Sequence, residues 1–158
     1  MTLRKIISGG QTGADRAALD WAMANRVLHG GYCPKGRLAE DGPIPTSYAL
    51  LETKTDQYPE RTKLNVETSN ATLVIVGESK LTRGSKLTVT HAEKKQKPVL
   101  TVFAAGLDQP TEAQIAEVRT WLEKHDPMVL NVAGSRASTS PNAYAFTKAL
   151  MDATLGNK

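Results

Sequence analysis

The chain has 158 residues, of which 40% are hydrophobic and 23% charged, and this length fits one domain that we expect to span residues 1–158. A formal charge of +4 favours an anionic partner, whereas an aromatic content of 5% argues against a stacking platform for single-stranded nucleic acid. The lone cysteine excludes an intrachain disulfide, and no segment approaches the roughly 20 apolar residues that span a bilayer, so we expect a cytoplasmic protein.

Four short apolar runs bounded by turn residues predict β-strands. They cover residues 5–7, 71–77, 98–103 and 128–132. Each run is continuously apolar rather than alternating, which is typical of parallel strands that are covered on both faces.

Helical patterns follow the first two runs. Residues 14–25 form the clearer pattern, and Thr12 and Asp15 at its start have the spacing of a capping box. Residues 85–95 form a weaker pattern. We expect a helix at both places.

Two further helices are predicted in the last third of the chain. Thr111 to Gln114 have the pattern of a second capping box, and apolar residues at helical spacing follow it. Ser140 and Pro141 predict the N-cap and the first turn of a closing helix.

The alternation of strand and helix predicts the fold class α/β, with an open, mostly parallel sheet and helices on both faces. Residues 32–65 interrupt this alternation, because they contain several prolines and glycines and show no clear periodicity. We interpret them as a long loop, and loops of that length in a compact domain are usually functional or disordered.

The most informative feature is the turn between the first strand and the first helix. It consists of Gly9, Gly10, Gln11, Thr12 and Gly13. Glycines let the backbone approach a ligand, and a helix start offers free N–H groups and a positive dipole end, so the turn suits an anion. The spacing is neither that of a dinucleotide fingerprint nor that of a Walker loop. The alternative is a tight turn that needs glycine for packing.

This interpretation makes Gly10 the position to test. A valine there should fill the space where the backbone meets the anion, so we expect Gly10→Val to abolish ligand binding while sparing the fold. Normal binding by that variant would make the turn a structural one.

Charged residues after this turn have two interpretations each. Arg16, Lys35 and Arg37 can contact a phosphate. The alternative for Arg16 is a pair with an acid on the surface, and for Lys35 and Arg37 it is a solvated polar loop. Glu40 and Asp41 are candidates to hold Mg²⁺ or to act as acid and base groups, and a solvated polar loop is the alternative.

The cysteine and the histidines give weaker signals. Cys33 could bind a soft metal as thiolate, although a lone cysteine is more often simply packed. The three histidines lack metal-ligand spacing, so we assign them no catalytic role. The identity of any metal is left open.

Two more glycine-bearing turns follow predicted strands. One contains Gly84, Ser85 and Thr88, and the other contains Gly134 and Arg136. Because ligands in open α/β sheets bind beyond the carboxyl ends of the strands, these turns and the first one could face a single cleft.

Several of these segments together resemble the molybdenum carrier family (molybdenum cofactor carrier protein-like). The segments are residues 8–16, 33–37, 39–42, 52–53, 58–62, 84–85 and 131–134. That family is related to a wider Rossmann-like superfamily, which also contains the LONELY GUY phosphoribohydrolases, known too as lysine decarboxylase-like proteins. The resemblance covers nearly the whole chain.

The resemblance implies a Rossmann-like fold, a homo-oligomer that is commonly a tetramer, and binding of molybdenum cofactor (molybdopterin) as cargo. It carries the ligand contacts over to residues 9–13, Arg16, Lys35, Arg37, Gly84 and Ser85. One departure matters: the phosphoribohydrolases have a catalytic glutamate in their second glycine turn, and residues 81–88 lack it. Hydrolysis by their mechanism is therefore not expected.

Our leading hypothesis is thus a non-enzymatic carrier of an anionic small molecule that passes its cargo to molybdoenzymes. The first alternative is a nucleotide-processing hydrolase that uses Glu40 or Asp41, with Mg²⁺ as a candidate cofactor. The second is a nucleotide-sensing module, suggested by the basic charge alone. We expect neither a membrane nor a nucleic acid as partner.

Overall fold

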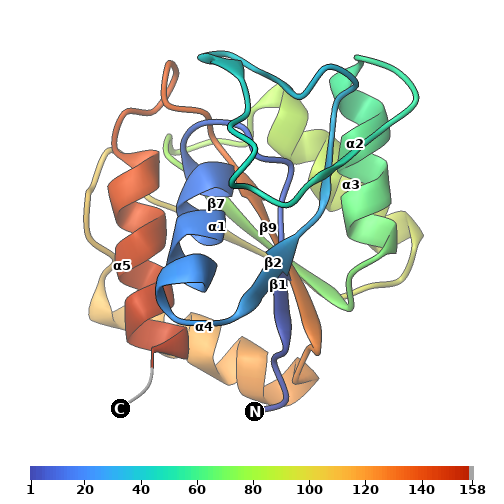
Figure 1. Ribbon diagram of the computed structural model, residues 1–158. Coiled ribbons are helices and arrows are strands. Elements are labelled where there is room, and N and C mark those ends of the chain that lie inside the picture. Colours follow the sequence, from blue (N-terminus) through green and yellow to red (C-terminus); the bar gives the residue numbers. More distant parts are fainter. Residues whose placement is uncertain (157–158) are drawn as a thin grey trace.

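The computed structural model describes residues 1–156, and its centre is a five-stranded sheet in which all neighbouring strands are parallel (Figure 1). The strand order is β2-β1-β9-β7-β8. The strands are β1 (Lys5–Ile7), β2 (Leu28–Gly30), β7 (Ala71–Val76), β8 (Val99–Phe103) and β9 (Val129–Gly134). Every residue of β7 is buried, as expected of a strand that is covered on both faces.

Helices cover both faces of this sheet, which confirms the predicted fold class. On one face lie α1 (Ala14–Ala24), α4 (Glu112–His125) and α5 (Ala143–Leu155). On the other face α2 (Tyr58–Glu67) and α3 (Arg83–Lys94) lie side by side. The main apolar core lies under the first group, where Trp21, Leu122 and Phe146 are buried together with Leu130 and Val132 of β9.

The strand order reveals a permutation. Doubly wound nucleotide-binding sheets have the order 3-2-1-4-5-6, so the first strand of the chain lies where the order reverses. In this protein β9, the last strand, takes that central place, and the other four strands keep their usual order around it. The end of α5 and the start of β1 lie at the same end of the molecule, so joining them would restore the usual connection (Figure 1).

One of the three predicted helix starts is confirmed in detail. Thr111 is the N-cap of α4: its hydroxyl oxygen accepts a bond from the Gln114 amide at 3.1 Å, and the Gln114 side chain accepts from the Thr111 amide at 3.0 Å. Two orphan donors of the helix are thereby satisfied, as in a complete capping box.

The other two predicted caps are wrong. At α1 the N-cap is Gly13, without a side-chain cap, because the Thr12 hydroxyl oxygen accepts from the Ala137 amide at 3.1 Å and its hydrogen goes to Glu40. At α5 the N-cap is Asn142, and the Ser140 hydroxyl donates to Glu78. In both cases partners from distant loops hold the hydroxyl, and it does not cap the helix.

Residues 32–65 are more ordered than the predicted loop. They contain α2 and two pairs of short strands: β3 (Tyr32–Cys33) with β6 (Leu51–Glu52), and β4 (Leu38–Ala39) with β5 (Gly42–Pro43). A second apolar cluster of Leu19, Cys33, Ile44 and Leu50 anchors the segment to α1. Strand β2 was not predicted from the sequence either.

Within residues 1–156, none of the helices has the length and apolar character needed to cross a membrane.

The packing of Gly10 changes the expected outcome of the valine test. Gly10 has a φ of +76°, and a Cβ atom there would lie 2.6 Å from Leu50 Cδ1 and 2.9 Å from Ile44 Cδ1. The expectation that Gly10→Val spares the fold is therefore wrong. We expect the variant to lose about 2–5 kcal/mol of unfolding free energy, through left-handed strain and overpacking. Urea unfolding measures this loss.

Gly84→Ala is the matched control, because a Cβ atom at Gly84 meets no atom within 4 Å. It should leave the unfolding free energy unchanged or raise it by up to about 1 kcal/mol, as expected of alanine in a helix. Equal stability of Gly10→Val and wild type would contradict the packing described here.

Candidate functional site

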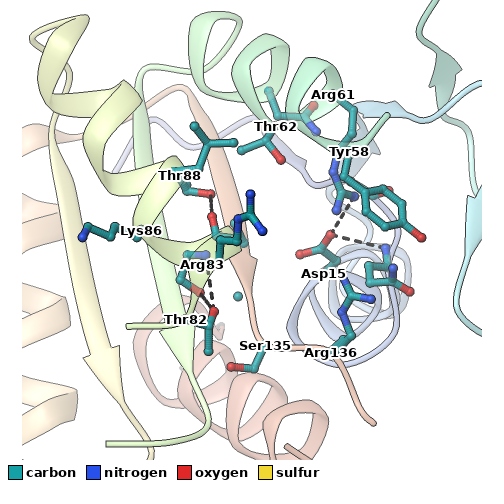
Figure 2. A pocket seen from close by; sticks show the side chains of 18 of the residues that line it. Asp15, Tyr58, Arg61, Thr62, Thr82, Arg83, Lys86, Thr88, Ser135 and Arg136 are labelled. Carbon is teal, nitrogen blue, oxygen red and sulfur yellow. Dashed lines mark hydrogen bonds and ion pairs between the residues drawn. The ribbon is translucent and has the colours of Figure 1, made fainter. Parts of the chain in front are cut away.

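A cavity of about 780 Å³ lies between α2, α3 and the carboxyl end of β9 (Figure 2). This volume is in the range of small-molecule sites. Its wall includes Gly9 and Gln11 from the turn after β1, Asn131 and Ala133 from β9, and the start of α3. The cavity therefore lies where ligands of open α/β sheets bind, at the reversal of the strand order.

Four cations line this cavity. Arg61 comes from α2, Arg83 and Lys86 come from the start of α3, and Arg136 follows β9. Among the described residues, Asp15 is the only acid in the lining. Such an excess of one sign in a concave site concentrates anions.

The N-terminus of α3 adds to this field. Its N-cap is Thr82, whose side-chain oxygen accepts a bond from the Ser85 amide at 3.4 Å. The positive end of the helix dipole therefore points toward the cavity, next to Gly84 and Ser85, which both line it. The second glycine turn of the sequence thus forms one wall of the cavity.

Tyr58 holds two of the cations in place. The guanidinium carbons of Arg61 and Arg136 lie 5.1 Å and 5.4 Å from the centre of its ring. Cation–π contacts at these distances are attractive. Tyr58 thereby connects α2 to the segment after β9 at one side of the cavity.

The turn after β1 is filled by the protein itself. The Oδ2 atom of Asp15 accepts a bond from the Gln11 amide at 3.3 Å and lies 3.4 Å from Nη1 of Arg61. Other amides of the turn also have internal acceptors: Gly10 donates to the Ser8 hydroxyl and Thr12 to the Gln11 side chain. These three amides are therefore not free to bind an external anion, contrary to the expectation from the sequence.

Burial raises the pKa of Asp15, although Arg61 and nearby backbone N–H groups oppose the shift. Asp15 is 5% exposed, so the removal of its carboxylate from water has the largest effect on this pKa. A carboxylate thus lies where the sequence analysis placed an external phosphate.

The predicted site residues divide into two groups. Those that line the cavity are Gly9, Gln11, Gly84, Ser85, Thr88, Gly134 and Arg136. Those outside its lining are Gly10, Thr12, Gly13, Arg16, Lys35 and Arg37. Ligand contact stays a prediction for both groups, although the second group does not line this cavity.

Arg16 and Arg37 of the second group have contacts within the protein. Arg16 pairs with Asp41 through two bonds of 3.0 Å and 3.1 Å, and its Nε donates to the Gly10 carbonyl. The Arg37 guanidinium donates to four backbone carbonyls between residues 44 and 50, at 2.7–3.4 Å. Both guanidinium groups therefore hold loops rather than face the cavity.

The candidate acids also have structural partners. The Glu40 carboxylate accepts bonds from the Ser138 amide and hydroxyl, at 3.1 Å and 2.5 Å, and it lies outside the cavity lining. The hydrogen bond from Arg16 lowers the pKa of Asp41. Among residues 1–156, no group of three or more His, Cys, Asp or Glu side chains could hold a metal ion.

Cys33 is packed in the second apolar cluster, and burial raises the pKa of its thiol. A thiol in such surroundings is inert, so the packed interpretation of this cysteine fits the structure.

Sequence reasoning missed Tyr58, Arg61, Arg83 and Lys86 as lining residues. Residues 58–62 were part of the family resemblance but received no role, because α2 was hidden in the predicted loop. Arg83 adjoins the second glycine turn, so a count of cations at that helix start could have found it.

The fold and cavity define a permuted doubly wound α/β domain with a cationic ligand site at the carboxyl edge of its sheet. The model of the circularly permutated YpsA SLOG family matches residues 6–155, and the chain belongs to this family. It is also similar to the 1.45 Å crystal structure named "Putative molybdenum carrier protein" from Syntrophus aciditrophicus SB. The identity is 44%, the alignment covers 98% of this chain and 96% of that chain, and the TM-score is 0.91. No curated protein matches the chain.

These findings confirm the resemblance drawn from the sequence motifs and the Rossmann-like fold that it implied. The name of the similar structure describes that protein alone, and the cargo of the present chain belongs to the proposal below.

Replacing Asp15 should change how stability depends on pH. Because the pKa of Asp15 is raised above 3.8, the folded protein binds more protons than the unfolded chain between that value and the raised one. This proton binding by Asp15 contributes stability to the folded protein that is fully present below pH 3.8 and is lost as the pH rises through the raised pKa. The Tm of Asp15→Asn relative to wild type should therefore rise with pH, as scans from about pH 3 to pH 8 would measure.

Asp41→Asn is the control of opposite sign. The pKa of Asp41 is lowered, so its contribution is present above pH 3.8 and is lost as the pH falls. The Tm of this variant relative to wild type should fall as the pH rises. Parallel curves for the two variants would contradict the assignment for Asp15.

Proposed function

We propose that this protein binds and carries a phosphate-bearing small molecule, most specifically molybdenum cofactor, in the cavity between α2 and α3. The observation that carries the proposal is the convergence of Arg61, Arg83, Lys86 and Arg136 with the N-terminus of α3 on one cavity. The similar structure named as a molybdenum carrier supports the choice of cargo.

The phosphate of the cargo belongs at the start of α3. There the positive end of the helix dipole and the side chain of Arg83 meet at one wall of the cavity. A charge-assisted bond contributes about 1.5–3 kcal/mol, compared with about 0.3–1 kcal/mol for a helix dipole. Direct arginine contacts should therefore dominate the affinity, with Arg136 completing the charge from the opposite wall.

The described side chains favour a protein that carries its ligand over one that hydrolyses it. Glu40 and Asp41, the acids that a hydrolase was expected to use, lie outside the cavity lining and are bound to other residues. Residues 81–88 lack the glutamate of the phosphoribohydrolases. Delivery to molybdoenzyme recipients and assembly into a homo-oligomer complete the proposal.

The protection of molybdenum cofactor from oxidation tests this proposal. Wild-type protein should slow the oxidative loss of the cofactor in air, and Arg83→Gln should weaken apparent binding about tenfold or more, because it removes a charge-assisted bond. Equal decay rates with and without wild-type protein would refute the proposal.

Arg4→Gln is the matched control, since it removes the same charge from an exposed residue just before β1, at the opposite edge of the sheet. It should protect the cofactor like wild type. Equal losses of protection in Arg83→Gln and Arg4→Gln would mean that only the net charge of the protein matters, and not a contact at Arg83.

A size series at Gly84 replaces the valine test at Gly10. Gly84 lines the cavity, and a Cβ atom there meets no atom within 4 Å, so a side chain would extend into open space. Gly84→Leu should fold like wild type but protect the cofactor about tenfold less well or worse, because the leucine occupies the phosphate position. Gly84→Ala should be close to wild type. Full protection by Gly84→Leu would place the phosphate elsewhere.

A further inference from the structure

We infer that the inner wall of the cavity, formed by Gln11 and Asn131, recognises the hydrogen-bonding edge of a planar heterocycle on the same cargo. The inference rests on the proposed function, because it assigns the uncharged end of a ligand whose phosphate lies at α3. The chemical class is a ring that carries a donor beside an acceptor, as pterins and guanine do.

Gln11 supplies a fixed donor. Its Oε1 atom accepts bonds from the Thr12 amide at 3.1 Å and the Glu40 amide at 2.9 Å. Two backbone donors on one atom settle which end of the amide is oxygen, so Nε2 is the free end. Gln11 is 3% exposed, it lines the cavity, and Nε2 has no hydrogen-bond partner.

Asn131 supplies the second free group. It lies on β9, is 2% exposed and lines the cavity. Its Nδ2 atom donates to the Thr72 hydroxyl at 3.3 Å, whereas Oδ1 has no partner. The terminal torsion of an asparagine is soft, so this amide can turn toward a ligand whose contacts replace the bond to Thr72.

A nearby asparagine shows that free amide ends are not general in this cavity. Asn65 also lines the wall, but its Oδ1 accepts from the Tyr32 amide at 2.8 Å and its Nδ2 donates to the Tyr32 carbonyl at 3.0 Å. A buried polar group without a partner costs about 1–3 kcal/mol. Both free atoms are fully buried, so small movements of the two side chains would let a ligand in the cavity pair with them.

The charges in the cavity orient this ligand. The cations Arg83, Lys86 and Arg136 are half-buried or exposed, whereas Gln11 and Asn131 are buried and neutral. A phosphate is therefore best placed at the outer, cationic part and an uncharged ring at the inner wall. Few polar groups suffice to fix such an orientation in a small-molecule site.

Calorimetry with three ligands of equal phosphate content tests the inference on the wild-type protein. The ligands are ribose 5-phosphate, purine riboside 5′-monophosphate, which lacks the exocyclic groups, and GMP. GMP should bind about tenfold more tightly than purine riboside monophosphate, because a site with buried polar groups rejects ligands that leave them unpaired. Equal affinities for those two overturn the inference, while binding of ribose 5-phosphate shows that the phosphate site stands. No binding of any ligand overturns the proposed function and this inference together.

Asn131→Leu, which keeps the shape without the polar atoms, should bring GMP and purine riboside monophosphate within about twofold of each other and leave ribose 5-phosphate unchanged. Thr147→Val is the matched control, since the Thr147 hydroxyl on α5 is also buried without a partner but lies outside the cavity lining. It should keep the wild-type preference. Retained preference in Asn131→Leu, or loss of it in Thr147→Val, overturns the assignment.

Competition between guanosine and 6-hydroxymethylpterin, which both lack a phosphate, distinguishes the two kinds of ring. Displacement of guanosine by a lower concentration of the pterin identifies a pterin cargo, and the reverse order identifies a purine nucleotide. Failure of both rings to compete for one site overturns the inference.

Discussion

The buried carboxylate of Asp15 is the contact on which the arrangement of the site depends. It joins the Gln11 amide of the turn after β1 to Arg61 of α2, which connects the two walls of the cavity. Arg61 also donates to the Gly9 carbonyl at 3.0 Å, and a Cβ atom at Gly9 would lie 1.9 Å from Nη1 of Arg61. Gly9 is therefore glycine because the guanidinium of α2 lies against the backbone there.

The sequence predicted four of the five strands of the main sheet, because short continuously apolar runs such as residues 71–76 are typical of parallel strands buried on both faces. It missed β2 because Leu28–Gly30 is short and Leu28 is 70% exposed. It missed α2 because Pro59 lies among the other prolines of the segment, although proline is favourable in the first turn of a helix. Local sequence patterns predict such short elements poorly, because tertiary contacts determine whether they form.

The site was predicted unevenly for the same reason. The turns around Gly84 and Gly134 line the cavity, because β7 and β9 are neighbours and their carboxyl ends meet. The Thr12–Asp15 spacing matched a helix cap, yet the Thr12 hydroxyl donates to Glu40, which is 28 positions away in the sequence. Likewise, Arg37 is a residue type that often binds phosphate, but here it donates to backbone carbonyls. No sequence motif indicates these contacts.

The central place of β9 has a consequence for synthesis on the ribosome. The pairs β1–β2 and β7–β8 flank β9, so their inner edges stay unpaired until residues 129–134 have been translated. Exposed strand edges are templates for pairing with other chains, so a nascent or prematurely terminated product carries an aggregation hazard that the finished molecule lacks. Because Asn131 and Gly134 belong to β9, no partially translated chain has a complete cavity.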